Sequence, residues 1–334
     1  MAQWSTSLFE VLRSLAIFAT TATSIWLVNF IRLHVLHTST LGRYLHNGKH
    51  GIDSKDNTGS WACVTGASDG IGYCFAEELA SRGFNVVLHG RNKDKLQKLR
   101  DTLQAQYPSR SFHLLIIDAS DRDSWNAPMT DFVSEFEESN ARLTVLVNNV
   151  GGVAGPFYMF EPMGERPAKS VIAHIDINAT FPAVFTHALL PLLSKNQPAL
   201  ILNLCSFASV FPPPYLALYS GSKAFNQAWS EGLAREMEAE GLDIEVMAIM
   251  LARVRSAINR GREFDNITVP TSQVFARAAL NKVGCGRLVV VPYWAHELLI
   301  AAVKVLPGWL TSKMIAAGIP EEIAWERRNE NGKK

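Results

Sequence analysis

Apolar runs alternate with stretches of helical periodicity along most of the chain. The apolar runs lie within residues 60–64, 85–89, 112–117, 143–147, 199–206, 244–250 and 287–291. Short runs of this kind, bounded by polar turns, are typical of buried strands. Between two of them, Leu96, Leu99 and Leu103 recur at the spacing of an amphipathic helix. Because strands and helices alternate throughout, the pattern predicts an α/β fold built on a doubly wound parallel sheet.

The longest uncharged segment near the N-terminus covers residues 14–31. As a helix, about 18 residues rising about 1.5 Å each would extend about 27 Å, which suits the thinner bilayer of the endoplasmic reticulum. Basic residues are more numerous after this segment (Arg32, Arg43, Lys49) than before it (Arg13). The positive-inside rule then places the following chain in the cytosol. The segment predicts a membrane anchor, with an amphipathic surface helix as the alternative.

This pattern divides the chain into four parts. Residues 1–35 form the N-terminal anchor, residues 36–59 a polar, solvated linker, and residues 60–292 the globular domain. Residues 293–334 form a C-terminal amphipathic segment that ends in a charged tail without regular structure. Its apolar stretch, residues 298–310, is interrupted by charges and a proline, which favours a helix lying on the membrane or packed on the domain.

Composition and charge exclude several other classes of function. The formal net charge is +1 and no basic stripe stands out, so we expect no nucleic-acid partner. The four cysteines are scattered, without the paired spacing of a metal site. They are typical of reduced, packed cysteines in a cytosol-facing protein, and we expect neither a metal nor a set of disulfides.

A glycine-rich turn follows the first predicted strand. It runs Thr65-Gly66-Ala67-Ser68-Asp69-Gly70-Ile71-Gly72 and leads into helical spacing. Glycines allow the backbone to approach a pyrophosphate, and a helix N-terminus supplies amide donors and a favourable dipole. In this strand–turn–helix context we expect a dinucleotide to be bound by Gly66, Ser68, Gly70, Ile71 and Gly72. An ordinary tight turn is the alternative interpretation.

The end of the second predicted strand indicates which dinucleotide is bound. An NAD site usually carries an acidic residue there, which holds the ribose 2′-hydroxyl. In this chain Gly90 stands at that place and Arg91 follows it. An arginine can bind a 2′-phosphate through two parallel hydrogen bonds. The sequence therefore favours NADPH as the cofactor, unless Arg91 is only a solvated loop residue.

Three polar side chains are expected to meet at one point. Ser206 ends a predicted strand, and Tyr219 and Lys223 lie at i and i+4 on the helix that follows. Free tyrosine, with a pKa of about 10, is a poor acid at neutral pH, and a neighbouring Lys⁺ favours the phenolate. Ser206 could hold a substrate oxygen by a hydrogen bond. The set predicts proton delivery to a carbonyl oxygen.

Taken together, residues 65–291 resemble the short-chain dehydrogenase/reductase family. The resemblance rests on the glycine turn, Asp118, Asn148-Asn149-Val150-Gly151, Asn178, Ser206, Tyr219 and Lys223. It implies a Rossmann-type fold in which Tyr219 is the general acid and Ser206 orients the carbonyl. It implies that Lys223 binds the nicotinamide ribose and lowers the pKa of Tyr219, and that Asn178 holds a water in a proton relay behind Lys223. Asp118 and Asn148 would lie along the adenosine.

The chain departs from the family pattern after the sixth predicted strand. The expected Pro-Gly and threonine are replaced by Met250-Leu251-Ala252-Arg253-Val254-Arg255-Ser256. Within this segment Val254 is the candidate cofactor contact. The departure favours a catalytically silent nucleotide-binding membrane scaffold as a rival function. Retention of Ser206, Tyr219, Lys223 and Asn178 argues for an enzyme instead.

A narrower resemblance concerns one branch of the family. The membrane segment, the run from Tyr219 to Lys223, and Pro292-Tyr293-Trp294-Ala295-His296 resemble very-long-chain 3-oxoacyl-CoA reductases and the related 17β-hydroxysteroid dehydrogenases. This implies NADPH-dependent reduction of a ketone on an apolar substrate, first a long-chain 3-oxoacyl-CoA of fatty-acid elongation. A steroid or secondary-metabolite ketone is the alternative. Residues 257–269 would cover the substrate. The implied location is the endoplasmic reticulum membrane, with a homodimer or elongation-complex partners left open.

Overall fold

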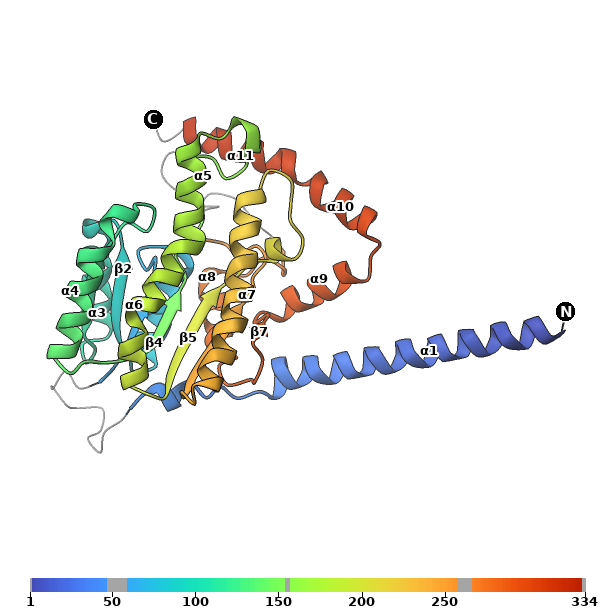
Figure 1. Ribbon diagram of the computed structural model, residues 1–334, viewed down its shortest axis with the longest axis horizontal. Coiled ribbons are helices and arrows are strands. Elements are labelled where there is room, and N and C mark those ends of the chain that lie inside the picture. The colour runs from blue at the N-terminus through green and yellow to red at the C-terminus, as the bar shows by residue number, and fades with distance from the viewer. Residues whose placement is uncertain (1, 47–58, 154–156, 257–265, 332–334) are drawn as a thin grey trace.

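The computed structural model describes residues 2–46, 59–153, 157–256 and 266–331. Its centre is a parallel sheet of seven strands in the order β3-β2-β1-β4-β5-β6-β7 (Figure 1). This arrangement confirms the predicted doubly wound parallel sheet. The strands are β1 Ser60–Val64, β2 Asn85–Gly90, β3 Phe112–Ile116, β4 Arg142–Asn148, β5 Ala199–Leu204, β6 Ile244–Ile249 and β7 Val289–Val290.

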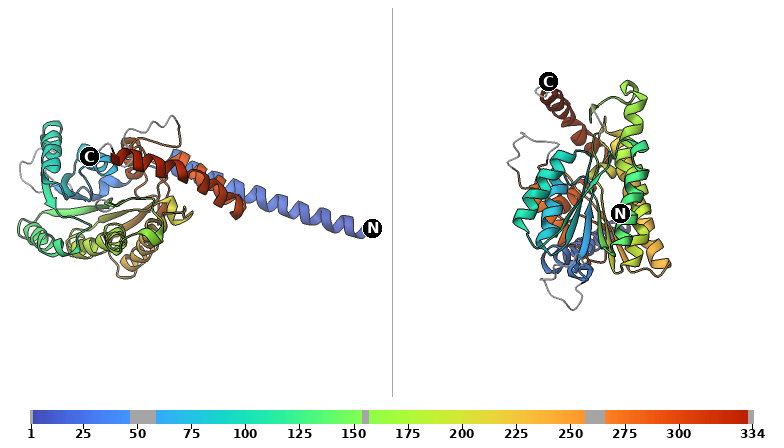
Figure 2. Two further views of the ribbon diagram at one scale, coloured as in Figure 1. Left: turned by 90° about the horizontal axis from the view of Figure 1, so that it is seen from above. Right: turned by 90° about the vertical axis from the view of Figure 1, so that its left-hand side faces the viewer.

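Helices cover both faces of the sheet (Figure 2). Successive residues of β1 point to opposite faces, so that Val64 belongs to one core cluster and Cys63 to the other. The first cluster contains apolar residues of α2 (Gly70–Ser81), α3 (Lys93–Gln106) and α8 (Ser272–Leu280). The second contains those of α4 (Asn126–Glu138), α6 (Phe181–Lys195) and α7 (Ala217–Ala239). The two clusters hold the strand ends in fixed positions.

The strand order reverses at β1, with β2 and β3 on one side and β4 to β7 on the other. In open α/β sheets, ligands bind at such a switch point, beyond the carboxyl ends of the strands. The glycine turn follows β1 and the Asn148-Asn149 pair ends β4, so both lie at this edge. The topology therefore brings the predicted cofactor residues to one edge of the sheet.

Helix α1 (Ala2–Ile31) extends away from the domain and continues into a π-helical turn, Arg32–Leu36 (Figure 1). The segment Phe9–Leu36 is long and apolar enough to cross a membrane, with a mean hydropathy of 1.6 over its most apolar stretch, none of which is buried. The segment Ala168–Lys195 meets the same criteria of length and composition, but 56% of its most apolar stretch is buried in the domain. Helix α1 thus has the properties of the predicted anchor.

The chain after α1 is not the solvated linker predicted from its polar composition. Leu33, Leu41 and Tyr44 are 3%, 3% and 0% exposed and belong to the first core cluster. Thr144 Oγ1 donates to the Tyr44 carbonyl at 2.8 Å, and the Tyr44 hydroxyl donates to Glu245 of β6. We call residues 32–46 the N-terminal strap. The linker prediction is wrong for residues 36–46, because Leu41 and Tyr44 pack into the core, although Leu36 is exposed. Residues 47–58 lie outside the described chain.

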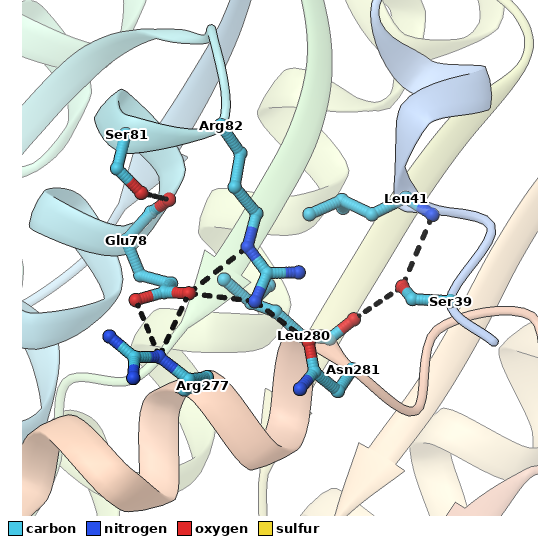
Figure 3. A network of polar contacts seen from close by, with 8 residues as sticks. All are labelled: Ser39, Leu41, Glu78, Ser81, Arg82, Arg277, Leu280 and Asn281. Atoms are coloured by element: carbon cyan, nitrogen blue, oxygen red, sulfur yellow. Dashed lines mark hydrogen bonds and ion pairs between the residues drawn. The ribbon is translucent and has the colours of Figure 1, made fainter. Parts of the chain in front are cut away.

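Polar contacts fasten this strap to the end of α8 (Figure 3). Ser39 Oγ donates to the Leu280 carbonyl at 2.6 Å and accepts from the backbone N–H of Leu41 at 3.3 Å. Beside it, Glu78 of α2 pairs with Arg82 at 2.7 Å and with Arg277 of α8 at 3.3 Å. The strap, α2 and α8 therefore form one packed unit.

Three helices follow β7: α9 (Trp294–Lys304), α10 (Gly308–Ala317) and α11 (Ile319–Asn331). They form an arc that leaves the sheet near β7 and returns toward the carboxyl ends of the strands (Figure 1). The predicted unstructured tail is wrong for residues 327–331, which belong to α11. Contacts of α11 with loops at that edge, described below, account for its order.

The strap gives a test by truncation. A chain beginning at Arg32 keeps Leu33, Leu41 and Tyr44, whereas a chain beginning at Asp56 lacks all three. We expect the shorter chain to unfold at a clearly lower temperature, because loss of each buried leucine contact costs about 2–5 kcal/mol in a comparable core. Circular dichroism during heating measures the difference. Equal melting temperatures for the two chains would contradict the structural role of the strap.

Candidate active site

The glycine turn between β1 and α2 is too crowded for side chains. Gly66 and Gly70 have φ angles of +66° and +56°, a conformation that favours glycine. A Cβ atom on Gly72 would lie 2.2 Å from the carbonyl oxygen of Gly66. Asp69 caps α2 by accepting from the Gly70 N–H at 2.8 Å. The first turn of α2 thus lies directly against the strand end, where its N–H groups can face a phosphate. Ser68 and Ile71 are half-buried within this turn.

Two residues that sequence reasoning missed hold the turn in place. Asn149 Nδ2 donates to the Thr65 carbonyl at 2.9 Å, and His89 Nδ1 accepts from the Gly66 N–H at 3.2 Å. The His89 ring is buried and stacks on Phe181, with ring centroids 5.1 Å apart. Burial lowers the pKa of His89 to about 3, so the ring stays neutral and its Nδ1 can accept. Both could have been found in the sequence from their positions, because His89 lies at the carboxyl end of β2 and Asn149 directly follows β4.

Asn148, predicted as a cofactor contact, has its side chain inside the domain. Its Nδ2 donates to Thr186 Oγ1 at 2.8 Å and to Asn203 Oδ1 at 2.7 Å. It therefore links β4 to β5 and α6. Because successive strand residues face opposite sides, the neighbouring Asn149 points to the turn instead. The structure thus places the Asn149 amide at the glycine turn, and the Asn148 amide in the core.

Arg91 and Asp118 meet at the rim of the same edge. The Arg91 guanidinium lies 3.6 Å from an Asp118 carboxylate oxygen, and the Arg91 side chain is 57% exposed. Ser120 donates to Asp118 through its backbone N–H at 3.0 Å and its hydroxyl at 2.7 Å. Burial alone would raise the pKa of Asp118, but the Ser120 hydrogen bonds and the Arg91 charge together lower it. Asp118 is therefore ionised, and Arg91 stands in the open beside the turn.

Ser206, Tyr219 and Lys223 converge as predicted. Ser206 lies just beyond β5, Tyr219 in the first turn of α7, and Lys223 one turn later. Ser206 Oγ accepts from the Ala208 N–H at 3.2 Å and lies near enough to the Tyr219 hydroxyl to influence its pKa. Lys223 Nζ lies 5.8 Å from the centre of the Tyr219 ring and donates to the Leu204 carbonyl at 2.8 Å. A hydroxyl, a phenol and an ammonium group therefore lie together beyond the carboxyl end of β5.

The pKa of Tyr219 is raised, and not lowered as the sequence suggested. Burial is the main cause, and the hydrogen bond with Ser206 only partly opposes it. Burial also lowers the pKa of Lys223. Removing the phenolate from water therefore has a larger effect on the pKa than the contact with Ser206. Tyr219 consequently keeps its proton at neutral pH, which suits it to act as an acid.

Asn178 lies on a π-helical turn, Asp176–Thr180, between α5 (Ala168–Ile175) and α6. Its buried amide donates to the Gly152 carbonyl and accepts from the Gly152 N–H, both at 2.8 Å. A Cβ on Gly151 would lie 2.9 Å from Asn178 Oδ1 and 3.2 Å from Lys223 Nζ. Asn178 therefore sits across Gly151 from Lys223, and its amide holds the loop after β4. Its predicted role in a water relay stays a prediction.

His296 secures the segment that departs from the family pattern. Its Nδ1 accepts from the Ala252 N–H at 3.3 Å, and its Nε2 lies 3.2 Å from the Arg253 carbonyl and 3.0 Å from the Thr268 carbonyl. Burial lowers the pKa of His296, which favours the neutral ring that this pattern requires. Val254 is 4% exposed, and its side chain belongs to the first core cluster. The predicted substrate cover lies largely outside the described residues.

The residues at this edge fit a dinucleotide. The Gly66–Gly72 turn is a cradle that a Cβ would fill, and it adjoins a helix N-terminus. Arg91 offers guanidinium N–H donors at one end of this edge. Tyr219 and Lys223 stand at the other end, beyond β5. The chain could therefore hold a nucleotide along the strand ends, with its reactive part near Ser206.

Comparisons with known proteins agree with this geometry. A family model described as short chain dehydrogenase matches residues 60–266. Very-long-chain 3-oxoacyl-CoA reductases of Pyricularia oryzae and Debaryomyces hansenii are 34% and 38% identical to this chain. The first match covers 72% of this chain and 71% of the relative, the second 72% and 70%.

Solved structures show the same fold. A short-chain dehydrogenase from Sphingobium yanoikuyae in complex with NADPH aligns with a TM-score of 0.61 and 25% identity, covering 73% of this chain and 92% of that one. A 7β-hydroxysteroid dehydrogenase aligns with a TM-score of 0.64 and 20% identity, covering 75% and 94%. The second likeness bears on the fold alone.

The glycine turn predicts the effect of one added methyl group. Gly72→Ala places a Cβ against the Gly66 carbonyl, so we expect NADPH binding to weaken about tenfold or more, equivalent to about 1.4 kcal/mol per factor of ten. Gly232→Ala on α7 is the control, because a Cβ there meets nothing within 4 Å. Quenching of protein fluorescence by NADPH measures both. Equal affinity in the two variants would show that the turn tolerates a side chain.

Proposed function

The chain belongs to the short-chain dehydrogenase family, and we propose that it reduces long-chain 3-oxoacyl-CoA to 3-hydroxyacyl-CoA with NADPH. The observation that carries the reaction type is the convergence of Ser206, Tyr219 and Lys223 beyond β5, with Lys223 Nζ 5.8 Å from the centre of the Tyr219 ring. The substrate class rests on the relatives named very-long-chain 3-oxoacyl-CoA reductase at 34–38% identity. Retention of a complete proton-donating set argues against a silent scaffold.

In the proposed mechanism each residue has one task. Bound NADPH supplies the hydride to the carbonyl carbon. Ser206 donates a hydrogen bond to the carbonyl oxygen and fixes it beside the Tyr219 hydroxyl. Tyr219 gives its proton to that oxygen as negative charge develops there. Lys223, held by the Leu204 carbonyl, then stabilises the phenolate by its positive charge.

Cofactor positioning follows from the remaining residues. The glycine turn and the N-terminus of α2 would hold the pyrophosphate, and Asn149 and His89 keep that turn in shape. Arg91 would bind the 2′-phosphate, with Asp118 as its neighbour at the rim. Asn178 keeps the loop after β4 against Lys223 through Gly152. The nucleotide would thus span the switch point of the sheet.

An apolar substrate agrees with the N-terminal helix. Each buried CH₂ favours partition into a membrane by about 0.8 kcal/mol, so a long acyl chain is concentrated where α1 would anchor the enzyme. We propose the endoplasmic reticulum membrane as the location, with the domain in the cytosol as the distribution of basic residues indicates. A homodimer or partners in an elongation complex stay predictions.

The proposed reaction is tested with purified full-length protein. NADPH oxidation is followed with 3-oxoacyl-CoAs of increasing chain length and with a steroid ketone. We expect the rate to depend on acyl length, and Tyr219→Phe to lose nearly all turnover while NADPH still binds. Activity with the steroid alone would overturn the substrate assignment. Near-normal turnover of Tyr219→Phe would overturn the mechanism.

The preference for NADPH over NADH is tested by a substitution of Arg91. Arg91→Ala removes the proposed 2′-phosphate contact, so we expect NADPH binding to weaken by about 1.5–3 kcal/mol, the scale of a hydrogen bond to a charged group. NADH, which lacks this phosphate, should bind the variant and the wild type alike. Arg100→Ala, an exposed arginine of α3 paired with Asp101, is the control. Equal wild-type affinities for NADPH and NADH would refute the role of Arg91.

A further inference from the structure

An apolar groove of about 510 Å³ is lined in part by the loop that precedes α7 and has no part in the mechanism above. It is lined by Pro214, Tyr215, Ala316, Ile319, Pro320 and Ile323. Its volume is within the range of about 300–1,000 Å³ typical of small-molecule sites. One wall is the loop that precedes α7, and the other is the junction of α10 and α11. The groove is therefore built from two segments about a hundred residues apart in the chain.

The first wall is part of the catalytic corner. Pro214 and Tyr215 lie on the loop that connects Ser206 to Tyr219, the two residues proposed to contact the carbonyl oxygen. Tyr215 has a φ of +66°, an uncommon angle for a residue with a side chain. Its ring lines the groove and is 44% exposed. An apolar group in the groove would thus contact the loop that joins the two residues proposed to bind the carbonyl oxygen.

Helix α11, which forms part of the second wall, is hydrogen-bonded to loops at the carboxyl edge of the sheet. Glu326 accepts from the N–H groups of Met159 and Phe160, on the loop after β4, at 2.6 and 3.1 Å. Glu322 accepts from Arg253, on the segment after β6, at 2.5 Å. One helix therefore bridges two loops that leave the carboxyl ends of separate strands.

The groove is continuous with a helix that offers apolar side chains to the surroundings. Trp309 and Met314 of α10 are 63% and 55% exposed, and Val305, just before α10, is 82% exposed. The turn between α9 and α10 extends to the same side of the domain as α1 (Figures 1 and 2). If α1 crosses a bilayer, the turn between α9 and α10 lies toward that bilayer, and α10 leads from this turn to Ala316 in the groove.

We propose that the groove binds the acyl chain of the substrate, with α11 as its outer wall. This inference rests on the proposed function, because it concerns the chain attached to the ketone that Tyr219 protonates. The lining supplies apolar contacts without a charged side chain, which suits methylene groups and not the coenzyme A moiety. The geometry makes Ala316 and Ile323 determinants of chain-length specificity.

Adjacent alanines on α10 provide a matched pair for the test. Ala316 lines the groove, whereas its exposed neighbour Ala317 is not among the lining residues. In the full chain in nanodiscs, Ala316→Trp fills the groove. We expect kcat/KM for 3-oxostearoyl-CoA to fall about tenfold or more, the scale on which pockets discriminate methylene groups. With acetoacetyl-CoA, Ala316→Trp should match the wild type, and Ala317→Trp should be unchanged with both substrates.

A second variant keeps the test valid if Ala316→Trp fails to fold. Ile323→Ala removes apolar contact without adding bulk, so it should also lower kcat/KM for the long chain and spare the short one. Equal loss with both substrates, or no loss in either groove variant, would overturn the acyl-chain site. Weaker liposome binding with an unchanged chain-length profile would assign the groove to bulk lipid and also overturn it. Failure of wild-type protein to reduce any 3-oxoacyl-CoA would instead remove the proposed function itself.

Discussion

The burial of one ammonium group, that of Lys223, governs how the site is assembled. A buried charge is costly unless nearby dipoles compensate for lost hydration. Here the Leu204 carbonyl at the end of β5 accepts a hydrogen bond from Nζ at 2.8 Å. The loop after β4 passes close by, and a glycine at position 151 leaves room for both neighbours, since a Cβ would lie 2.9 Å from Asn178 Oδ1 and 3.2 Å from Nζ. Asn178 holds that loop through Gly152. The end of β5, the loop after β4 and the π-helical turn are thus arranged around the Lys223 side chain, which α7 supplies.

Burial also decides the resting protonation state of Tyr219. Sequence reasoning weighed only the charge of Lys223, which favours the phenolate. In the folded chain, loss of water around Tyr219 has the larger effect, and its pKa is raised. A tyrosine that keeps its proton is prepared to donate it, which agrees with reduction of a ketone.

Much of this site could be predicted because its signals are local in sequence. The glycine turn, the i, i+4 pair of Tyr219 and Lys223, and the alternation of strands each depend on spacing alone. The strap was missed because Leu41 and Tyr44 are two apolar residues in a largely polar segment. Only their packing in the core and the contacts of Tyr44 with β4 and β6 show their role. Which of Asn148 and Asn149 faces the turn depends on strand register. The contacts of Glu326 join residues far apart in the chain, and no local pattern indicates them.

The C-terminal helices α10 and α11 bear on how a membrane-bound substrate would reach the site. A long acyl chain that left the bilayer for water would lose about 0.8 kcal/mol for each exposed CH₂. An enzyme with a site facing bulk solvent would have to compensate for this entire cost through binding. A groove bounded by α10 and α11, on the side to which α1 points, shortens the exposed path. Since α11 is tied to the loops after β4 and β6, the wall that receives the chain and the loops that surround the ketone are held as one unit.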